Sequence, residues 1–197
     1  MPAYVIYING WPGVGKLAVA RALQPLIPSS QILHNHDLID PVEKRYPRGH
    51  GLYQKKRSEY RQQRLRPMMK DPELKDTVFI FTDSQTEHND CMGDYTDLAL
   101  GEDGRRFYSV ILHCEQAENE RRLQLPGRGG GINGKLTDVG VLRRYREHGD
   151  GIWKFGDEDE VEIDVTSPSA EEAAEVVWRF VDRREREGRS WGVDDLP

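Results

Sequence analysis

The feature that most constrains the fold lies near the N-terminus, where a short apolar run leads through a glycine-rich turn into a helical pattern. The apolar run covers residues 4–8, and the helical pattern covers residues 15–25. Between them, Gly10, Gly15 and Lys16 match the spacing G-x-x-x-x-G-K of a phosphate-binding loop. Because this motif needs a strand before it and a helix after it, the context predicts a nucleotide site in an α/β fold.

The backbone of this segment explains the chemistry of the motif. Glycines let the main chain wrap closely around a phosphate, and the inward N–H groups and the helix dipole then favour an anion. Lys16 adds a full positive charge for the β- and γ-phosphates. The alternative interpretation is a glycine-rich turn with a surface lysine. We expect nucleotide contacts from the phosphate loop, residues 10–17, which consists of Gly10, Trp11, Pro12, Gly13, Val14, Gly15, Lys16 and Leu17.

Leu17 departs from the motif, because the usual Ser or Thr at this position supplies a hydroxyl ligand for Mg2+. Leucine has no oxygen with which to coordinate a hard cation. Three outcomes follow: the metal is held by waters and by carboxylates elsewhere, metal affinity falls while phosphate binding persists, or the pocket binds without turnover. We favour the first, because Mg2+ keeps most of its water and phosphate ligands in such sites.

Length and composition indicate a single domain over residues 1–187, followed by a C-terminal tail over residues 188–197. No apolar run reaches the roughly 18 residues needed to span a bilayer, so we expect no membrane segment. The N-terminus lacks the order of a secretory signal. Cys91 and Cys114 suit a reducing compartment, and the expected location is the cytoplasm.

Strand-like runs alternate with helix-like runs along the chain, which favours βαβ units and a mainly parallel sheet. The strand candidates are nearly continuous apolar runs, as expected for strands covered on both faces; they lie at 4–8, 30–34, 77–82, 107–114 and 161–166. The helix candidates lie at 15–25, 51–70, 87–100, 115–125, 138–148 and 169–187.

Several segments together with the phosphate loop resemble the small P-loop kinases. These segments are LHNHDLIDPV, VFIFTDSQ, GRGGGINGKLTD and DVTSPSAEEAAE. The family is the nucleoside-monophosphate-kinase-like group, which includes adenylate, shikimate and gluconate kinases and chloramphenicol phosphotransferase; the chain is most similar to proteins labelled AAA-family ATPase or shikimate-kinase-like. The resemblance implies a three-layer P-loop NTPase fold with a five-stranded parallel sheet of order 2-3-1-4-5. It also implies ATP and Mg2+ as cofactors, substrate-side helices over about 36–70, and a mobile lid over about 126–137.

The segment after the second strand carries candidates for the acceptor side, since ligands of doubly wound sheets bind beyond the strand ends. Similar kinases place an acid here that takes the proton of the acceptor hydroxyl. Asp37 matches this position best, and Asp40 and His36 are rivals; Asn35, His36 and Asp37 are also candidate substrate contacts. The alternative interpretation is that Asn35 or Asp37 caps the next helix.

A basic helix follows over residues 55–70, where Arg57, Arg61 and Arg64 lie three to four apart and therefore share a face. Guanidinium groups bind phosphates and carboxylates through two parallel hydrogen bonds, so Arg57 and Arg61 would suit an anionic acceptor. A solvated helix face is the alternative. Nucleic acid is disfavoured as a partner, because the net charge is −6 and no nucleic-acid motif accompanies the helix.

The end of the third strand carries Asp83 and Gln85. The resemblance implies that an acid at this point is an outer partner of the metal, and with Leu17 present, Asp83 would hold Mg2+ directly or through water. Gln85 would form a hydrogen bond with the acceptor or with the attacking water. The alternative is that Asp83 begins a turn or caps a helix.

Arginines on and beside the lid would close on the transferring phosphate, as the resemblance implies. Arg122 and Arg128 are the first candidates, followed by Lys135 as a nucleotide contact and by Arg143. Residues 166–168 would contact the base by the same resemblance.

The leading hypothesis is an ATP-dependent phosphotransferase that moves the γ-phosphate to a hydroxyl or phosphate of a small, anionic acceptor. One alternative is an NTP hydrolase or nucleotide switch. Another is a nucleotide-binding protein without catalysis, which Leu17 supports. The identity of the acceptor, the choice between ATP and GTP, and the oligomeric state stay open at this point.

Overall fold

The fold is built on one parallel sheet of five strands. The computed structural model describes residues 3–87, 93–95, 105–126, 136–147 and 151–190. The strand order is β2-β3-β1-β4-β5, and every neighbouring pair is parallel. The predicted order 2-3-1-4-5 is therefore confirmed. The strands are β1 Tyr4–Gly10, β2 Ser30–His34, β3 Val78–Thr82, β4 Arg106–His113 and β5 Glu160–Asp164.

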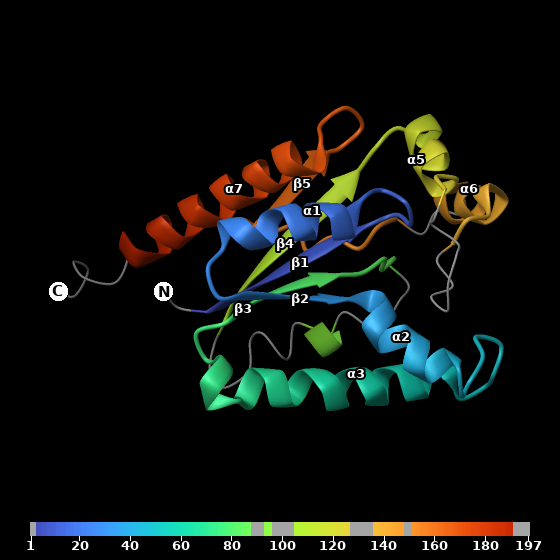
Figure 1. The fold of residues 1–197 in the computed structure, drawn as a ribbon, viewed down its shortest axis with the longest axis horizontal. Helices are drawn as coiled ribbons and strands as arrows, with labels where there is room; N and C mark the ends of the chain where they lie inside the picture. The colour runs from blue at the N-terminus through green and yellow to red at the C-terminus, as the bar shows by residue number, and fades with distance from the viewer. Residues whose placement is uncertain (1–2, 88–92, 96–104, 127–135, 148–150, 191–197) are drawn as a thin grey trace.

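Helices cover both faces of the sheet and make a three-layer structure (Figure 1). Helices α1 and α7 lie along one face, and α2 and α3 lie along the other. All strands point toward the side where α2, α5 and α6 lie, so the phosphate loop is on that side. The helices are α1 Lys16–Leu23, α2 Asn35–Glu43, α3 Tyr53–Lys70, α5 Gln116–Leu123, α6 Val139–Glu147 and α7 Ala170–Ser190, with 3-10 turns at Gln24–Leu26 and Pro72–Leu74.

The central strand β1 shows why the sheet is buried on both sides. All seven of its residues are buried. Its side chains alternate between the faces, as the strand geometry requires: Tyr4, Ile6 and Ile8 join the core under α1 and α7, whereas Val5 and Tyr7 join the core with α3. A strand with two apolar environments needs an uninterrupted apolar run, and that run was the signal in the sequence.

Side-chain caps hold the starts of two helices. At α7, Ser169 Oγ accepts a hydrogen bond from the Glu172 N–H at 3.1 Å, and Glu172 Oε2 accepts one from the Ser169 N–H at 2.8 Å. At α6, Asp138 Oδ1 accepts a hydrogen bond from the Val141 N–H at 3.0 Å. Each cap satisfies N–H groups that have no partner within the helix.

Helix α2 was missing from the helix candidates of the local pattern, although it lies largely within the segment 36–70 for which the resemblance implied substrate-side helices. It begins directly after β2 and contains Pro41, which removes one backbone donor and reads in sequence as a helix breaker. Burial of Leu38, Ile39 and Val42 against the rest of the protein outweighs that loss. The helix therefore depends on tertiary packing, which a local pattern does not record.

The other differences concern boundaries. The first helix changes to a 3-10 turn at Gln24, next to Pro25. Helix α7 continues to Ser190, so the first residues of the predicted tail are helical. Within the predicted helix 87–100, the structure describes only residue 87 and residues 93–95, and the latter three are helical. Among the described residues, no helix has both the length and the apolar character needed to cross a membrane.

Candidate active site

The phosphate loop turns sharply between β1 and α1, and its glycines are required by the geometry. Gly13 has a φ of 92°, in the left-handed region, and a Cβ there would lie 2.9 Å from Asn119 Nδ2. A Cβ on Gly10 would collide with the carbonyl oxygen of Leu112 in β4. Side chains at either position would push the loop out of this shape.

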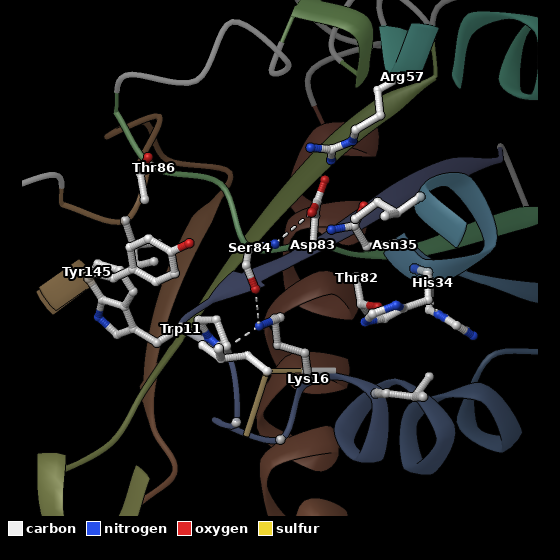
Figure 2. A pocket seen from close by; sticks show the side chains of 18 of the residues that line it. Trp11, Lys16, His34, Asn35, Arg57, Thr82, Asp83, Ser84, Thr86 and Tyr145 are labelled. Atoms are coloured by element: carbon white, nitrogen blue, oxygen red, sulfur yellow. Dashed lines mark hydrogen bonds between the residues drawn. The ribbon is translucent and has the colours of Figure 1, made fainter. Parts of the chain in front are cut away.

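Lys16 lies over the inside of the loop. Its Nζ donates hydrogen bonds to the carbonyl oxygens of Gly10 at 2.7 Å and Trp11 at 2.9 Å, and to Ser84 Oγ at 2.8 Å. Figure 2 shows this ammonium beside the end of β3, where Asp83 and Ser84 lie. The loop thus has the lysine position that phosphate binding needs.

Asn9, the residue before the loop, fastens it to the rest of the site. Its side chain is completely buried. Oδ1 accepts from the N–H groups of Gly10 and Gln85, both at 2.9 Å, and Nδ2 donates to the carbonyl oxygens of Gln85 at 3.0 Å and Trp153 at 3.2 Å. These four bonds join β1, the end of β3 and the segment around Trp153. Asn9 was not among the predicted site residues, although a polar residue at the end of an apolar strand was visible in the sequence.

A pocket of about 640 Å³ opens between the phosphate loop, the end of β3, and helices α2 and α3. Its volume falls within the range of small-molecule sites. The structure brings ten of the predicted site residues into its lining: Trp11, Pro12, Gly13, Gly15, Lys16, Leu17, Asn35, His36, Arg57 and Asp83. Gly10 and Val14 do not line it, because their places in the loop face the protein interior.

Asp37 is not placed at the pocket and instead caps helix α2. His34 is the N-cap residue, its Nδ1 accepts from the His36 N–H at 3.2 Å, and Asp37 Oδ2 accepts from the His34 N–H at 3.2 Å. The alternative of a capping role thus describes Asp37 in this structure. Its rival His36 does line the pocket, and His36 Nδ1 lies 3.0 Å from Asp40 Oδ1.

The three arginines that share a face of α3 meet three different environments. Arg57 lines the pocket with a relative exposure of 9 %. Arg61 is 1 % exposed, forms an ion pair with Asp94, and lies 5.4 Å from the centre of the Tyr95 ring. Arg64 is exposed to solvent. Arg61 was predicted as a substrate contact; the structure pairs it with Asp94 instead, and neither residue lines the pocket.

Asp83 lies at the end of β3 and is 1 % exposed. Oδ1 accepts from the Ser84 N–H at 2.7 Å, while Oδ2 accepts from Gln85 Nε2 and from the Tyr95 hydroxyl at 2.9 Å. Burial, with the Asp83 carboxylate as the next cause, raises the pKa of Tyr95 well above its ordinary value, so its hydroxyl stays a donor. Gln85 was predicted to contact the acceptor, but it is buried and holds Asp83.

Arg122 contacts the phosphate loop from helix α5. Its guanidinium donates to the carbonyl oxygens of Val14 at 3.0 Å and Val165 at 2.7 Å, and its Nε donates to Glu118 at 2.6 Å. It joins the loop to the end of β5 and does not line the pocket, in contrast to the predicted contact with the transferring phosphate. Arg128 and Lys135 lie outside the described residues. Arg143 is exposed and pairs with Glu120 at 2.6 Å.

The pocket lining is rich in positive charge. Lys16, Arg21, Arg48 and Arg57 line it, against the single carboxylate of Asp83 among the described residues. Such a cleft attracts anions. Several polar lining residues were not predicted, because they come from segments whose direction depends on the fold; these are Arg48, Tyr53, Gln54, Thr86 and Tyr145.

The residues present fit a magnesium ion that is held mainly by phosphate and water. The end of β3 offers the hard oxygen donors that Mg2+ prefers, in Asp83 and Ser84. Within the described part of the chain, no group of three or more His, Cys, Asp or Glu side chains could hold a metal alone. A site of this kind needs only one or two protein ligands.

Comparison with solved structures identifies the fold. The chain is similar to a gluconokinase from Sinorhizobium meliloti (TM-score 0.66, 16 % identity, covering 97 % of this chain and 98 % of the other). It is also similar to a sugar kinase from Janibacter (0.62, 15 %, 92 % and 95 %) and to the Mycobacterium tuberculosis APS kinase in complex with AMPPNP and APS (0.58, 14 %, 92 % and 98 %). No protein-family model and no curated protein matches the sequence. The protein thus has the fold of the P-loop small-molecule kinases.

Proposed function

We propose that this protein is an ATP-dependent phosphotransferase that acts on a small, anionic acceptor. The observation that carries the proposal is that Lys16 of the phosphate loop and the buried guanidinium of Arg57 line the same pocket. One cation serves the nucleotide phosphates, and the other is left for a second anion. The fold shared with several kinases supports the same class of reaction.

The nucleotide side would consist of the phosphate loop and the end of β3. The N–H groups of the loop and the ammonium of Lys16 would hold the phosphates, as oriented donors do in phosphoryl-transfer sites. When bound, Mg2+ would neutralise charge on the phosphate oxygens. Asp83 would contribute through water, because three protein donors already occupy its two oxygens.

The acceptor side would be centred on Arg57. Its guanidinium carbon lies 5.8 Å from the centre of the Tyr53 ring, and within the described residues it makes no ion pair with a carboxylate. Figure 2 shows Arg57 and Lys16 extending toward the end of β3 from opposite sides. A buried cation without a carboxylate partner is costly, and an anionic ligand would remove that cost.

His36 is the best placed of the three candidate bases. It lines the pocket, and Asp40 Oδ1 lies 3.0 Å from its Nδ1. A carboxylate behind the imidazole fixes the orientation of the ring and leaves Nε2 to accept a proton. Asp37, in contrast, is engaged in the cap of α2.

The first test is a calorimetric titration with ATP, followed by ADP release in the presence of candidate acceptors. We expect ATP to bind, and Lys16→Met to weaken binding by at least about tenfold, because a charge-assisted hydrogen bond contributes about 1.5–3 kcal/mol. Acceptor-dependent ADP release supports the kinase. Release that is independent of any acceptor would favour a hydrolase, and binding without release would favour a protein that only binds nucleotide.

Replacement of Arg57 tests the class of acceptor. We expect Arg57→Met to raise the KM for the acceptor by about 30-fold, since a bidentate contact to an anion contributes about 2 kcal/mol. Affinity for ATP should change little. Panels of sugar phosphates, sugar acids and nucleotides, each beside its uncharged counterpart, provide the substrates.

The matched control is Arg64→Met, which removes an exposed arginine from the same helix. It should leave the KM unchanged. An equal rise in both variants, or a preference for the uncharged acceptors, would contradict the assignment of Arg57.

A further inference from the structure

Because Leu17 replaces the usual Ser or Thr, the phosphate loop lacks the hydroxyl that normally coordinates Mg2+. Leu17 follows Lys16 at the start of α1, and its side chain lines the pocket. It brings a hydrocarbon to the place where the phosphate-loop motif normally supplies an oxygen ligand. If the pocket holds a metal with its nucleotide, another side chain must supply that oxygen or the site must do without it.

Ser84 lies where such an oxygen is needed. It follows Asp83 beyond the end of β3, and β3 pairs with β1 in a register that matches Ile8 with Thr82. This register brings Ser84 beside the phosphate loop, and its Oγ lies 2.8 Å from Lys16 Nζ. Ser84 also lines the pocket, and Figure 2 shows its hydroxyl directed at the lysine ammonium.

The contacts of Asp83 fix Ser84 in this position. Asp83 Oδ1 accepts the Ser84 N–H at 2.7 Å, and its Oδ2 is held by Gln85 and Tyr95. The carboxylate is thus committed to protein donors and orients the backbone that carries Ser84. The hydroxyl of Ser84 keeps lone pairs for another partner.

We propose that Ser84 supplies the hydroxyl oxygen that Leu17 lacks, and that it is the direct protein ligand of the magnesium–nucleotide complex. This inference rests on the proposed function of the pocket. A phosphate is a stronger acceptor for an ammonium than a hydroxyl is, so nucleotide binding would draw Lys16 away from Ser84 Oγ. The metal ligand of this protein then comes from the end of β3 and not from the helix after the loop.

The test measures the affinity of a non-hydrolysable ATP analogue by calorimetry, first in EDTA and then at saturating Mg2+. We expect Mg2+ to tighten binding by the wild-type protein. Ser84→Ala should reduce this tightening by about tenfold or more, as the loss of a metal-site partner typically does. Its affinity in EDTA should stay within about twofold of the wild-type value, because no metal is present to lose.

A rescue variant separates a metal ligand from a merely structural serine. Adding Leu17→Thr to Ser84→Ala returns a hydroxyl to the usual position of the motif and should restore the effect of Mg2+. Thr86→Val, which removes another hydroxyl of the same pocket, should leave that effect unchanged.

Each contrary result has a distinct meaning. An undiminished effect of Mg2+ in Ser84→Ala, or no rescue by Leu17→Thr, would overturn the assignment of Ser84 alone. Wild-type binding that needs Lys16 but ignores Mg2+ would overturn it as well, while the nucleotide site would stand. No binding that depends on Lys16 would overturn the proposed function together with this inference.

Discussion

Replacing Asp94 with leucine is expected to lower the free energy of unfolding by about 3–5 kcal/mol, the usual cost of removing one partner of a buried ion pair. Asp94 accepts hydrogen bonds from Arg61 Nη1, from Ser58 Oγ at 3.0 Å and from Gln62 Nε2 at 2.8 Å. The substitution removes the Asp94 carboxylate from the Arg61 guanidinium, which is only 1 % exposed. Arginine cannot escape by losing its proton.

Replacing Arg61, the other partner of the ion pair, should lower the free energy of unfolding by less. Arg61→Leu leaves a carboxylate that keeps two donors and is 11 % exposed, so we expect a loss of about 2 kcal/mol. The double variant should lose less than the sum of the two single variants, because each single variant already removes the interaction between the two charges. Urea unfolding at neutral pH measures all three.

The control for this series is Glu59→Leu, which breaks the exposed pair of Lys56 and Glu59 on the same helix. Exposed pairs contribute little, so its effect should be far smaller. Equal losses from Glu59→Leu and Asp94→Leu would show that burial is not the cause. A functional consequence follows from the neighbouring Tyr95, because its hydroxyl holds Asp83: destabilising the turn at residues 93–95 should also weaken metal-dependent nucleotide binding.

The architecture was predictable because parallel strands leave a strong local signal. A strand covered on both faces reads as a nearly continuous apolar run; β1 is buried at every position and is apolar from Tyr4 to Ile8. All five predicted strands are present, and their boundaries differ from the prediction by at most two residues. The order of the strands could not be predicted in this way, because the residues of one strand do not show which strands pair with it. The predicted order was implied by the resemblance to P-loop kinases.

The phosphate loop was predictable for a similar reason. Its function depends on residues that are adjacent in the chain, so Gly13, Gly15 and Lys16 fall together in any structure that keeps the turn. The acceptor side has no such local rule. Helical spacing correctly put Arg57 and Arg61 on one face of α3, but only the fold decides that the pocket meets Arg57 and that Asp94 meets Arg61.

Asp37 shows a second limit of local reasoning. A carboxylate three residues into a helix is both a good cap and a plausible base, and the sequence cannot choose between these roles. In the structure the Asp37 side chain takes the capping position, where it accepts the N–H of His34. His36, one residue earlier, lines the pocket. A shift of one residue along a helix turns a side chain by about 100° around the axis, enough to exchange the two positions.

Asn9 carries the second large effect that we predict, and it depends entirely on contacts between distant segments. Asn9→Leu removes four hydrogen bonds at once and leaves the N–H groups of Gly10 and Gln85 and the carbonyl groups of Gln85 and Trp153 without that partner. At about 1 kcal/mol or more for each buried group, the free energy of unfolding should fall by about 4 kcal/mol. Urea unfolding followed by tryptophan fluorescence measures the loss.

Asn119 provides a comparison, since it is as buried as Asn9 but its side chain makes two hydrogen bonds instead of four. Its Nδ2 donates to the Pro12 carbonyl oxygen at 2.9 Å, and its Oδ1 accepts from Arg146 at 3.0 Å. Asn119→Leu should therefore cost about 2 kcal/mol, half the loss at Asn9. Equal losses at the two sites would indicate that side-chain volume, not the number of hydrogen bonds, sets the cost.

A variant that keeps the shape of Asn9 isolates its donor. Asn9→Asp retains an acceptor for Gly10 and Gln85 but turns a carboxylate oxygen toward the carbonyl oxygens of Gln85 and Trp153. Burial and these carbonyl groups should raise the pKa of the introduced carboxyl group above its unfolded value. Its contribution to stability is then present at low pH, where the protonated group donates, and is lost as the pH rises through the raised pKa. Relative to the wild type, Asn9→Asp should therefore become more stable as the pH falls from neutral, and the opposite slope would show that the donor does not matter.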